Sequence, residues 1–306
     1  MKKYLILLFA AAGFIFGGCE YFENSDTRSI SQLEVNLSGL PAIPDTMTFV
    51  GWFDNDDGDP VKAFTLDADA NGNLVYSTTS EPLQHLQNAQ IFNVTIERKA
   101  VLNDSDFVPS GRLILSGRFK LGNASLAFAE TVNNFSAYSD SAVFNLSTPT
   151  DGPNTNELSG VWFVDSLNLP AGPIAGLYLP ALLSGWIYEG WVEVGGVFLS
   201  TGRFISASSP DNFSGYSGSG AKYNYPGEDF LNNPPAGVTF PLDLSNAKVY
   251  VSIELDNGED SGQAPSYKIF EATIPSGAQS GVTYPLQLSS PNLPGGVVKI
   301  TVDLLE

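Results

Sequence analysis

The chain has 306 residues, 43% of them hydrophobic, which is enough to bury one large core or two ordinary ones. Its 33 acidic and 14 basic residues give a formal net charge of −19, which disfavours nucleic acid and anionic lipid headgroups as partners. A single cysteine and a single histidine exclude a disulfide framework and leave little material for a zinc site or a catalytic triad.

The first residues have the pattern of an export signal. A basic start, Met1–Lys3, precedes an almost unbroken apolar run over 4–16, and Gly17 and Gly18 stand before Cys19. This order is typical of a secretory signal peptide, and the run is shorter than the ~20 apolar residues that span a bilayer. We therefore expect export and removal of residues 1–18.

A cysteine directly after two small residues resembles the lipobox of bacterial lipoproteins, although Phe16 replaces the usual Leu or Val. The resemblance implies cleavage before Cys19, acylation of that residue, and anchoring in the cell envelope, at the outer membrane of a Gram-negative bacterium. Several acyl chains on one residue give stable anchoring, since each buried CH₂ contributes ~0.8 kcal/mol. The alternative is an ordinary signal peptide with an unrelated cysteine.

Residues 19–31 are polar and aperiodic, and we expect a flexible tether there. Beyond them, apolar and polar residues alternate in the segments 92–97, 113–121, 249–255 and 298–304. A period of two indicates strands with one buried face, and Gly, Pro, Asn and Asp separate the runs at short intervals. The sequence therefore predicts an all-β fold.

An internal repeat divides the chain. Leu40–Trp52 aligns without a gap on Leu179–Trp191, Phe64 and Phe204 follow at similar distances, and 86–97 matches 244–254. We predict two related Ig-like β-sandwich domains in tandem, at 32–148 and 160–306, joined by a linker at 149–159. Trp52 and Trp191, each just before a hairpin turn, are expected to anchor the two cores.

The segment 179–192, together with Ser200-Thr-Gly-Arg-Phe204, resembles the extracytoplasmic domain of the anti-sigma-K factor family. That resemblance implies a β-sandwich outside the membrane. Full-length members also carry a cytosolic sigma-binding region and a transmembrane helix, and this chain has no counterpart of either. The resemblance therefore implies the outer module alone, used twice, without capture of a sigma factor.

The polar residues offer little for catalysis. His85 is the sole histidine, so we expect a structural or surface role for it, no enzymatic activity and no cofactor, although two acidic residues of a hydrolase could be hidden among the 33. A weak calcium candidate is Asp67, Asp69 and Asn71, where the closing position holds Thr78 instead of Glu. Asp54–Asp59 is a second acidic cluster. The alternative for both is turn chemistry.

The second copy carries an insertion at 206–240, the best candidate for a binding loop. Its rings and polar groups suit sugar or peptide surfaces, and the candidate contacts are Tyr216, Tyr223, Tyr225, Glu228, Asp229 and Phe230. The alternative is that the segment packs over an open end of the sandwich.

Together these patterns favour a lipid-anchored envelope protein with a non-enzymatic binding or sensing role. One alternative is a carbohydrate-binding surface lipoprotein that uses the 206–240 loop, and another is a structural or assembly component of the envelope. The expected partners are the membrane, through the lipid, and an envelope protein or a glycan, but no nucleic acid. The oligomeric state stays open.

Overall fold

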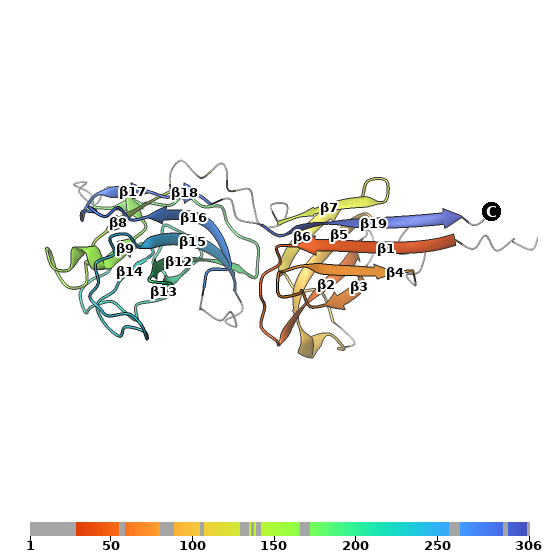
Figure 1. Cartoon of the computed structure of the whole chain (residues 1–306), viewed down its shortest axis with the longest axis horizontal. Coiled ribbons are helices and arrows are strands. Elements are labelled where there is room, and N and C mark those ends of the chain that lie inside the picture. Colours follow the sequence, from red (N-terminus) through yellow and green to blue (C-terminus); the bar gives the residue numbers. More distant parts are fainter. Residues whose placement is uncertain are drawn as a thin grey trace, which may run out of the picture.

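The computed structural model describes residues 29–54, 59–79, 89–104, 107–128, 135, 138, 142–165, 172–256, 264–289 and 293–304. The expected signal peptide, Cys19, most of the tether and His85 lie outside these ranges. Within them the regular structure is β-strand, apart from isolated 3-10 turns such as Lys99–Val101 and Glu157–Ser159. The strands form two lobes placed end to end (Figure 1), and the all-β prediction is confirmed.

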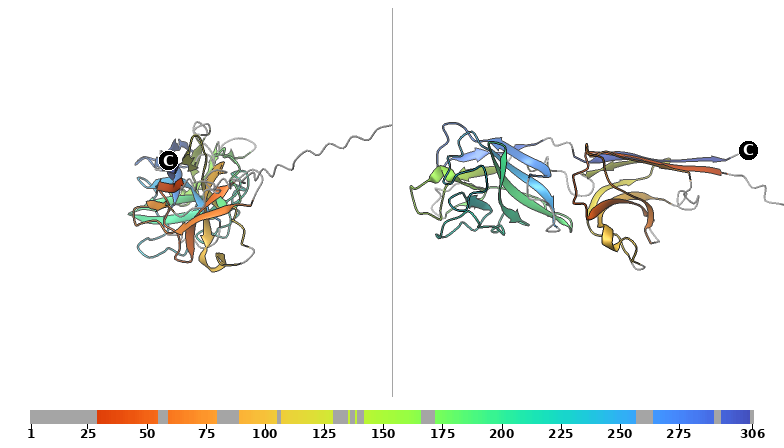
Figure 2. Two further views of the ribbon diagram at one scale, coloured as in Figure 1. Left: turned by 90° about the vertical axis from the view of Figure 1, so that its right-hand side faces the viewer. Right: turned by 60° about the horizontal axis from the view of Figure 1, so that its bottom comes forward.

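The first lobe is one eight-stranded antiparallel sheet that curls over its own core. The strand order is β3-β2-β5-β6-β7-β19-β1-β4. Figure 2 shows β1 and β19 on one side of this lobe and the curved strands β2 and β3 on the other. The strands are β1 Ser29–Ser38, β2 Met47–Asp54, β3 Val61–Leu66, β4 Leu74–Thr78, β5 Ile91–Arg98, β6 Leu113–Arg118, β7 Asn123–Ala127 and β19 Gly295–Leu304.

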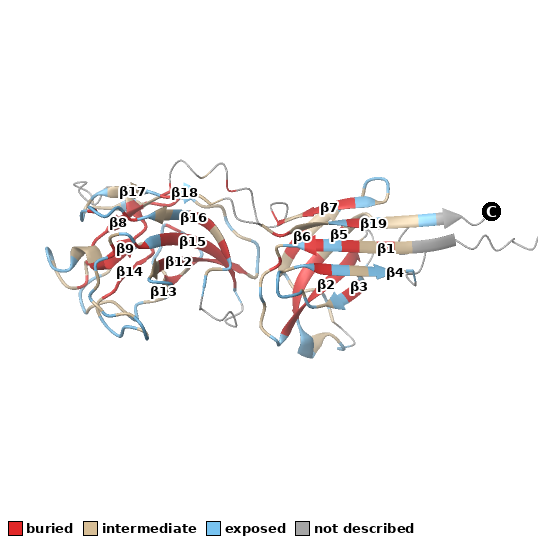
Figure 3. Cartoon of the chain, viewed as in Figure 1, coloured by how far each residue is buried: buried red, intermediate tan, exposed pale blue. Residues whose placement is uncertain are grey.

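Alternation along these strands fills the core of the first lobe. Leu33, Val35 and Leu37 of β1 are at most 3% exposed, whereas Glu34 and Asn36 between them face outward. Phe49 and Phe92, from two other strands, meet the β1 side chains in the same cluster. In Figure 3 the buried positions of β1 lie in its half nearer the second lobe, and β2 is buried over most of its length. The period-two pattern thus places one face of each strand in the core.

The second lobe is a sandwich of two main sheets, with strand orders β13-β12-β15-β16-β18 and β14-β9-β8-β17. A further pair, β10 and β11, continues beside them. Phe163, Phe230 and Phe270, each 0% exposed, belong to its core. The strands are β8 Val143–Leu146, β9 Gly160–Trp162, β10 Val164–Asp165, β11 Ile174–Ala175, β12 Trp186–Val194, β13 Val197–Phe204, β14 Gly227–Asp229, β15 Lys248–Leu255, β16 Tyr267–Thr273, β17 Thr283–Pro285 and β18 Gln287–Leu288.

Strand pairing differs from the expected boundaries at the end of each copy. β8, which the repeat placed in the segment 32–148, pairs with β9 and β17 of the second lobe. β19, from the segment 160–306, returns to the first lobe and pairs with β1 from Ser29↔Leu304 to Ser38↔Gly295. The first lobe therefore contains β19, the last strand of the second copy, because β19 pairs with β1. The second lobe contains β8, the last strand of the first copy, because β8 pairs with β9.

The internal repeat reappears as matching strand geometry. β3-β2-β5-β6 and β13-β12-β15-β16 have the same order, and their registers shift at Gly51/Trp52 and at Gly190/Trp191. A β-bulge therefore stands at the same place in both copies, directly before each tryptophan. Trp52 and Trp191 are 4% and 1% exposed, but neither belongs to the hydrophobic core cluster, and each indole bonds to a hydroxyl on the neighbouring strand. The prediction that they anchor the two cores is therefore wrong: their side chains lie on the opposite face of the sheet from core residues such as Phe53 and Val192.

One detail of the expected alignment was wrong. In the second copy Phe204 lies opposite Tyr188. The counterpart of Tyr188 in the first copy is Phe49, and the residue opposite Phe49 is Leu66, not Phe64. Phe64 instead lies opposite Gly51, where its ring occupies the space that a Cβ would need, with only 2.3 Å between that Cβ and the ring. The hairpin of the first copy is longer than that of the second, which the residue count alone did not reveal.

The first and last described strands share one pole of the molecule. β1 starts, and β19 ends, at the end of the first lobe that points away from the second lobe (Figure 1). Between the lobes, the Trp186 indole N–H donates to the Leu113 carbonyl at 3.1 Å and its ring meets that of Phe128. In the described part of the chain, no helix is long and apolar enough to cross a membrane.

Candidate functional site

The 206–240 segment places its predicted acidic contacts inside the protein. Glu228, Asp229 and Phe230 are all 0% exposed: Phe230 lies in the core, and the side chains of Lys222 and Trp162 contact the two acids of β14. The Phe230 ring packs on Tyr216 and Phe240 within the core cluster. These three residues therefore fit the alternative interpretation, in which the 206–240 segment packs over the sandwich.

Asp229 is held by groups far away in the sequence, and Glu228 by groups of the 206–240 segment itself. Asp229 accepts from the Trp162 indole at 2.7 Å and from the Thr150 backbone at 2.9 Å. Glu228 accepts from the Tyr216 backbone at 2.9 Å and from the Lys222 ammonium at 3.1 Å. Their oxygens are therefore occupied by the fold, as buried polar groups generally are.

Burial dominates the electrostatics of this cluster. It raises the pKa of Asp211, Glu228 and Asp229, while the Lys222 ammonium opposes the shift at Asp211 and Glu228. Lys222 lies 3.6 Å from Asp211 Oδ1 and 5.5 Å from the centre of the Trp162 ring. A single cation thus compensates two buried carboxylates, an arrangement that stabilises the inserted segment and leaves its acids closed to solvent.

The three predicted tyrosines are half-buried and do not form one platform. Tyr216 packs in the core cluster, and Tyr223 meets the Trp162 ring edge-on at 5.1 Å. Tyr225 is half-buried two residues further along. The structure brings Tyr216, Glu228 and Phe230 together, but as one packed unit.

The weak calcium candidate forms an ordinary polar turn. Asp69 Oδ1 accepts from the backbone of Asn71 at 2.9 Å and of Asn73 at 2.8 Å, and Asp67 pairs with Lys99 at 2.8 Å. These contacts lower the pKa of Asp67 and of Asp69. Among the residues that the structure describes, no group of three or more His, Cys, Asp or Glu side chains could hold a metal ion. The cluster at Asp54–Asp59 lies largely outside these residues.

Sequence analysis missed a polar unit that recurs in both copies. The Trp52 indole donates to Thr95 Oγ1 at 2.8 Å, and the Trp191 indole donates to Ser252 Oγ at the same distance. Two residues beyond each hydroxyl stands a buried glutamate, Glu97 or Glu254, which accepts from the backbone of a serine on the next segment. The repeated Thr/Ser-Ile-Glu pattern was the available signal.

Burial raises the pKa of Glu254 to about 7, against the hydrogen bonds from Ser252 and Ser266 that lower it. Because the carboxyl is 1% exposed and bonded to its own lobe, its role is structural.

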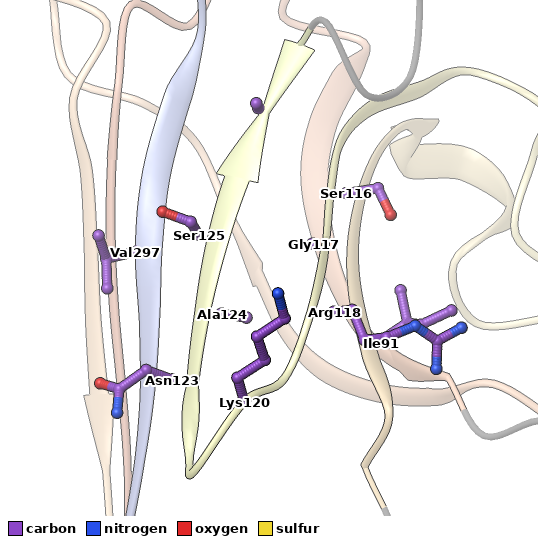
Figure 4. Close-up of a pocket in the computed structure, with 10 residues that line it drawn as sticks. Ile91, Ser116, Gly117, Arg118, Lys120, Asn123, Ala124, Ser125 and Val297 are labelled. Carbon is purple, nitrogen blue, oxygen red and sulfur yellow. The ribbon is translucent and has the colours of Figure 1, made fainter.

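An open cleft of about 610 Å³ lies on the outer face of the first lobe, where β6 and β7 form a hairpin (Figure 4). The two arms pair at Ser116↔Ala127 and at Lys120↔Asn123. Lys120 extends across the cleft between β7 and Arg118 in Figure 4. Small side chains make the floor concave, and the cleft is lined by Ile91, Ser116, Gly117, Arg118, Lys120, Asn123, Ala124, Ser125, Ala127 and Val297.

The cleft is electropositive in a strongly acidic protein. Arg118 and Lys120 supply two of the 14 cations in the chain, and none of the ten described residues that line the cleft is acidic. Arg118 donates to the Gln90 amide at 3.2 Å, which fixes the guanidinium at the rim and leaves further N–H donors for a ligand. With two hydroxyls and an amide from Ser116, Ser125 and Asn123, the cleft can bind an oxyanion with hydroxyl groups beside it.

Comparisons with known proteins leave the family open. No protein family matches the chain, and no curated protein sequence does. Among solved structures, the two C2 domains of extended synaptotagmin 2 match over 100% of this chain and 99% of theirs, at 12% identity and a TM-score of 0.17. A TM-score this low carries no argument about fold or function.

Proposed function

We propose that the protein is a lipid-anchored, non-enzymatic binding protein of the cell envelope. The sequence around Cys19 supports the anchor, and the cleft with Arg118 and Lys120 carries the binding role. Support for a non-enzymatic role comes from the buried acids, because Glu228, Asp229 and Glu254 each accept hydrogen bonds that stabilise the fold.

The proposed anchor orients the two lobes. The segment from Cys19 to Ser29 spans at most ~35 Å when fully extended. Because β1 begins at the pole remote from the second lobe, lipid on Cys19 would hold the first lobe next to the bilayer and direct the second lobe outward (Figure 1). Such an arrangement suits a protein that presents binding surfaces to the space beyond its membrane.

Metabolic labelling tests the anchor. Cells given labelled palmitate should incorporate it into the wild-type protein and not into Cys19→Ser, which should also leave the membrane fraction. Labelled Cys19→Ser, or a variant that stays in the membrane to the same extent, would refute the anchoring proposal. A second variant, Ser31→Cys in the Cys19→Ser background, should stay unlabelled because the signal, not the thiol alone, directs acylation.

A carbohydrate ligand is favoured at the cleft by one specific observation, the combination of two cations with hydroxyl and amide groups. The Arg118 guanidinium matches a carboxylate with two parallel donors, and Lys120 adds a point charge. Ser116, Ser125 and Asn123 can exchange hydrogen bonds with sugar hydroxyls. We therefore propose an acidic glycan as the ligand, bound at this cleft and not at the 206–240 segment.

Calorimetric titration with an oligogalacturonate and with a neutral dextran fragment of similar length tests the ligand class. The acidic chain should bind, and Arg118→Gln with Lys120→Gln should weaken it about tenfold or more, since hydrogen bonds to charged groups are worth about 1.5–3 kcal/mol. Lys62→Gln with Lys248→Gln, which removes the same two positive charges from exposed side chains that do not line the cleft, is the control. Equal affinity for the acidic and the neutral sugar would contradict the proposal. So would an unchanged affinity of the double variant for the acidic sugar.

A further inference from the structure

The two copies of the repeat differ at one matched position on their outer faces. Strand register places Asn93 directly opposite Trp52, and Tyr250 directly opposite Trp191. Two residues after each tryptophan stands an acid, Asp54 in the first copy and Glu193 in the second. Asn93 and Tyr250 are therefore counterparts, each beside a tryptophan and a carboxylate.

In the second copy, bulky side chains fill this position. The Tyr250 hydroxyl donates to Glu193 Oε2 at 2.6 Å. Its ring lies 6.2 Å from that of Phe198, and the Lys268 ammonium sits 4.1 Å from the centre of the Tyr250 ring. A phenol bonded to a carboxylate and covered by neighbouring side chains is thus part of the second copy itself.

The first copy has shorter side chains at the same three positions. The register makes Pro60 the counterpart of Phe198, Asn93 that of Tyr250, and Leu113 that of Lys268. All three line a pocket of about 360 Å³, a volume within the range of about 300–1,000 Å³ found for ligand pockets. The space that Tyr250 occupies in the second copy is a hollow in the first.

The carboxylate that accepts from the Tyr250 phenol in the second copy has a counterpart in the first copy, Asp54. Asn93 donates to Asp54 Oδ2 at 3.2 Å, which corresponds to the contact from Tyr250 to Glu193. Ser116 Oγ donates to Asn93 Oδ1 at 2.7 Å and fixes the amide in that orientation. The Asp54 carboxylate therefore lies at the edge of a mostly apolar pocket, where it can accept from a hydroxyl group that enters.

The rim of the pocket extends across both lobes. Leu183 and Ser184, from the segment before β12, line it together with Pro109 and Ser110 of the first lobe. Leu183 is 46% exposed, and Val108, next to Pro109, is 73% exposed. Leu183 lines the rim of the hollow and Val108 is next in sequence to the rim residue Pro109, so residues flanking an inserted side chain would contact both.

We propose that this pocket receives a tyrosine side chain from a partner polypeptide, with the phenol in the place that Tyr250 fills in the second copy and its hydroxyl donating to Asp54. The exposed rim favours a polypeptide over a free phenol, because flanking residues can cover Leu183 and Val108. No residue of the cleft with Arg118 and Lys120 lines this pocket, so the inference extends beyond the proposed glycan site.

Three probes test the proposal on the full-length protein: the pentapeptide Ala-Val-Tyr-Val-Ala, its Phe analogue, and N-acetyltyrosinamide. The tyrosine peptide should bind and shift the indole N–H resonance of Trp52, and its affinity should exceed that of the Phe analogue about tenfold. Equal affinity of the two peptides would overturn the role of the hydroxyl. N-acetyltyrosinamide that binds as tightly as the peptide would overturn the polypeptide partner.

Variants confirm or refute the location. Asn93→Tyr fills the pocket as Tyr250 fills its counterpart and should lower affinity at least about tenfold, whereas Tyr250→Phe in the second lobe should leave it unchanged. Asp54→Asn should remove the preference for Tyr over Phe and is the second test should Asn93→Tyr misfold. If Asn93→Tyr and Asp54→Asn both bind the tyrosine peptide as the wild type does, the proposed site is refuted. Arg118→Gln with Lys120→Gln should not alter peptide binding, which distinguishes the tyrosine pocket from the glycan cleft.

Discussion

The buried glutamate of the second copy should make stability depend on pH. Burial raises the pKa of Glu254 from 4.5 to about 7. In the unfolded chain this carboxyl loses its proton above pH ~4.5, whereas in the native protein it keeps the proton up to about 7. The native state therefore binds more protons than the unfolded state in this window, so its stability falls as pH rises from 4.5 to 7. The difference corresponds to about 3 kcal/mol.

Urea unfolding at pH steps between 4.5 and 8 measures this effect. Glu254→Gln removes the titration but keeps an amide oxygen for the Ser266 backbone N–H, which lies 2.9 Å from the carboxylate. The stability of the wild type relative to this variant should fall by about 3 kcal/mol from pH 4.5 to 7. Glu271→Gln, at an exposed position on the neighbouring strand, should keep the wild-type slope. A constant difference between wild type and Glu254→Gln would refute the reasoning.

Three further perturbations follow from the packing. Lys222→Met leaves two buried carboxylates without their shared cation and should lower the free energy of unfolding by about 3 kcal/mol, with loss of the 206–240 segment's resistance to proteolysis. Gly51→Ala drives a Cβ to within 2.3 Å of the Phe64 ring and should cost about 1–3 kcal/mol in chemical denaturation, whereas Gly277→Ala, in open space, should cost little. Deletion of 294–306 removes β19 and should raise amide exchange in β1 and β7 far more than in β12 and β15.

The sequence predicted those parts of the fold that depend on local pattern. Alternation over 249–255 gave β15, and the shared motifs around Trp52 and Trp191 gave the repeat, which returns as matching strand order. These features survive because each strand turns one face to a core regardless of which strand lies beside it. The all-β class followed from the same local rule.

The features that the sequence did not predict depend on partners distant in the chain. The Pro226-Gly-Glu-Asp segment has the composition of a loop, yet β14 buries its acids because Thr150 and Trp162 donate to one of them. The strand exchange of β8 and β19 likewise depends on register between sequence-distant strands. Nor could composition predict that Arg118 and Lys120 line a cleft, since only the course of the hairpin brings them to it.

The pairing of β1 with β19 also has a consequence for biosynthesis. β1 is translated before any other described strand and β19 after all of them, so the backbone groups of β1 that face β19 lack their partner while the rest of the lobe emerges. An unpaired strand edge is a template for aggregation. This edge of the nascent first lobe therefore stays unpaired until the last described strand is made, whereas β8 and β9 of the second lobe, close together in the chain, can pair as soon as both are translated.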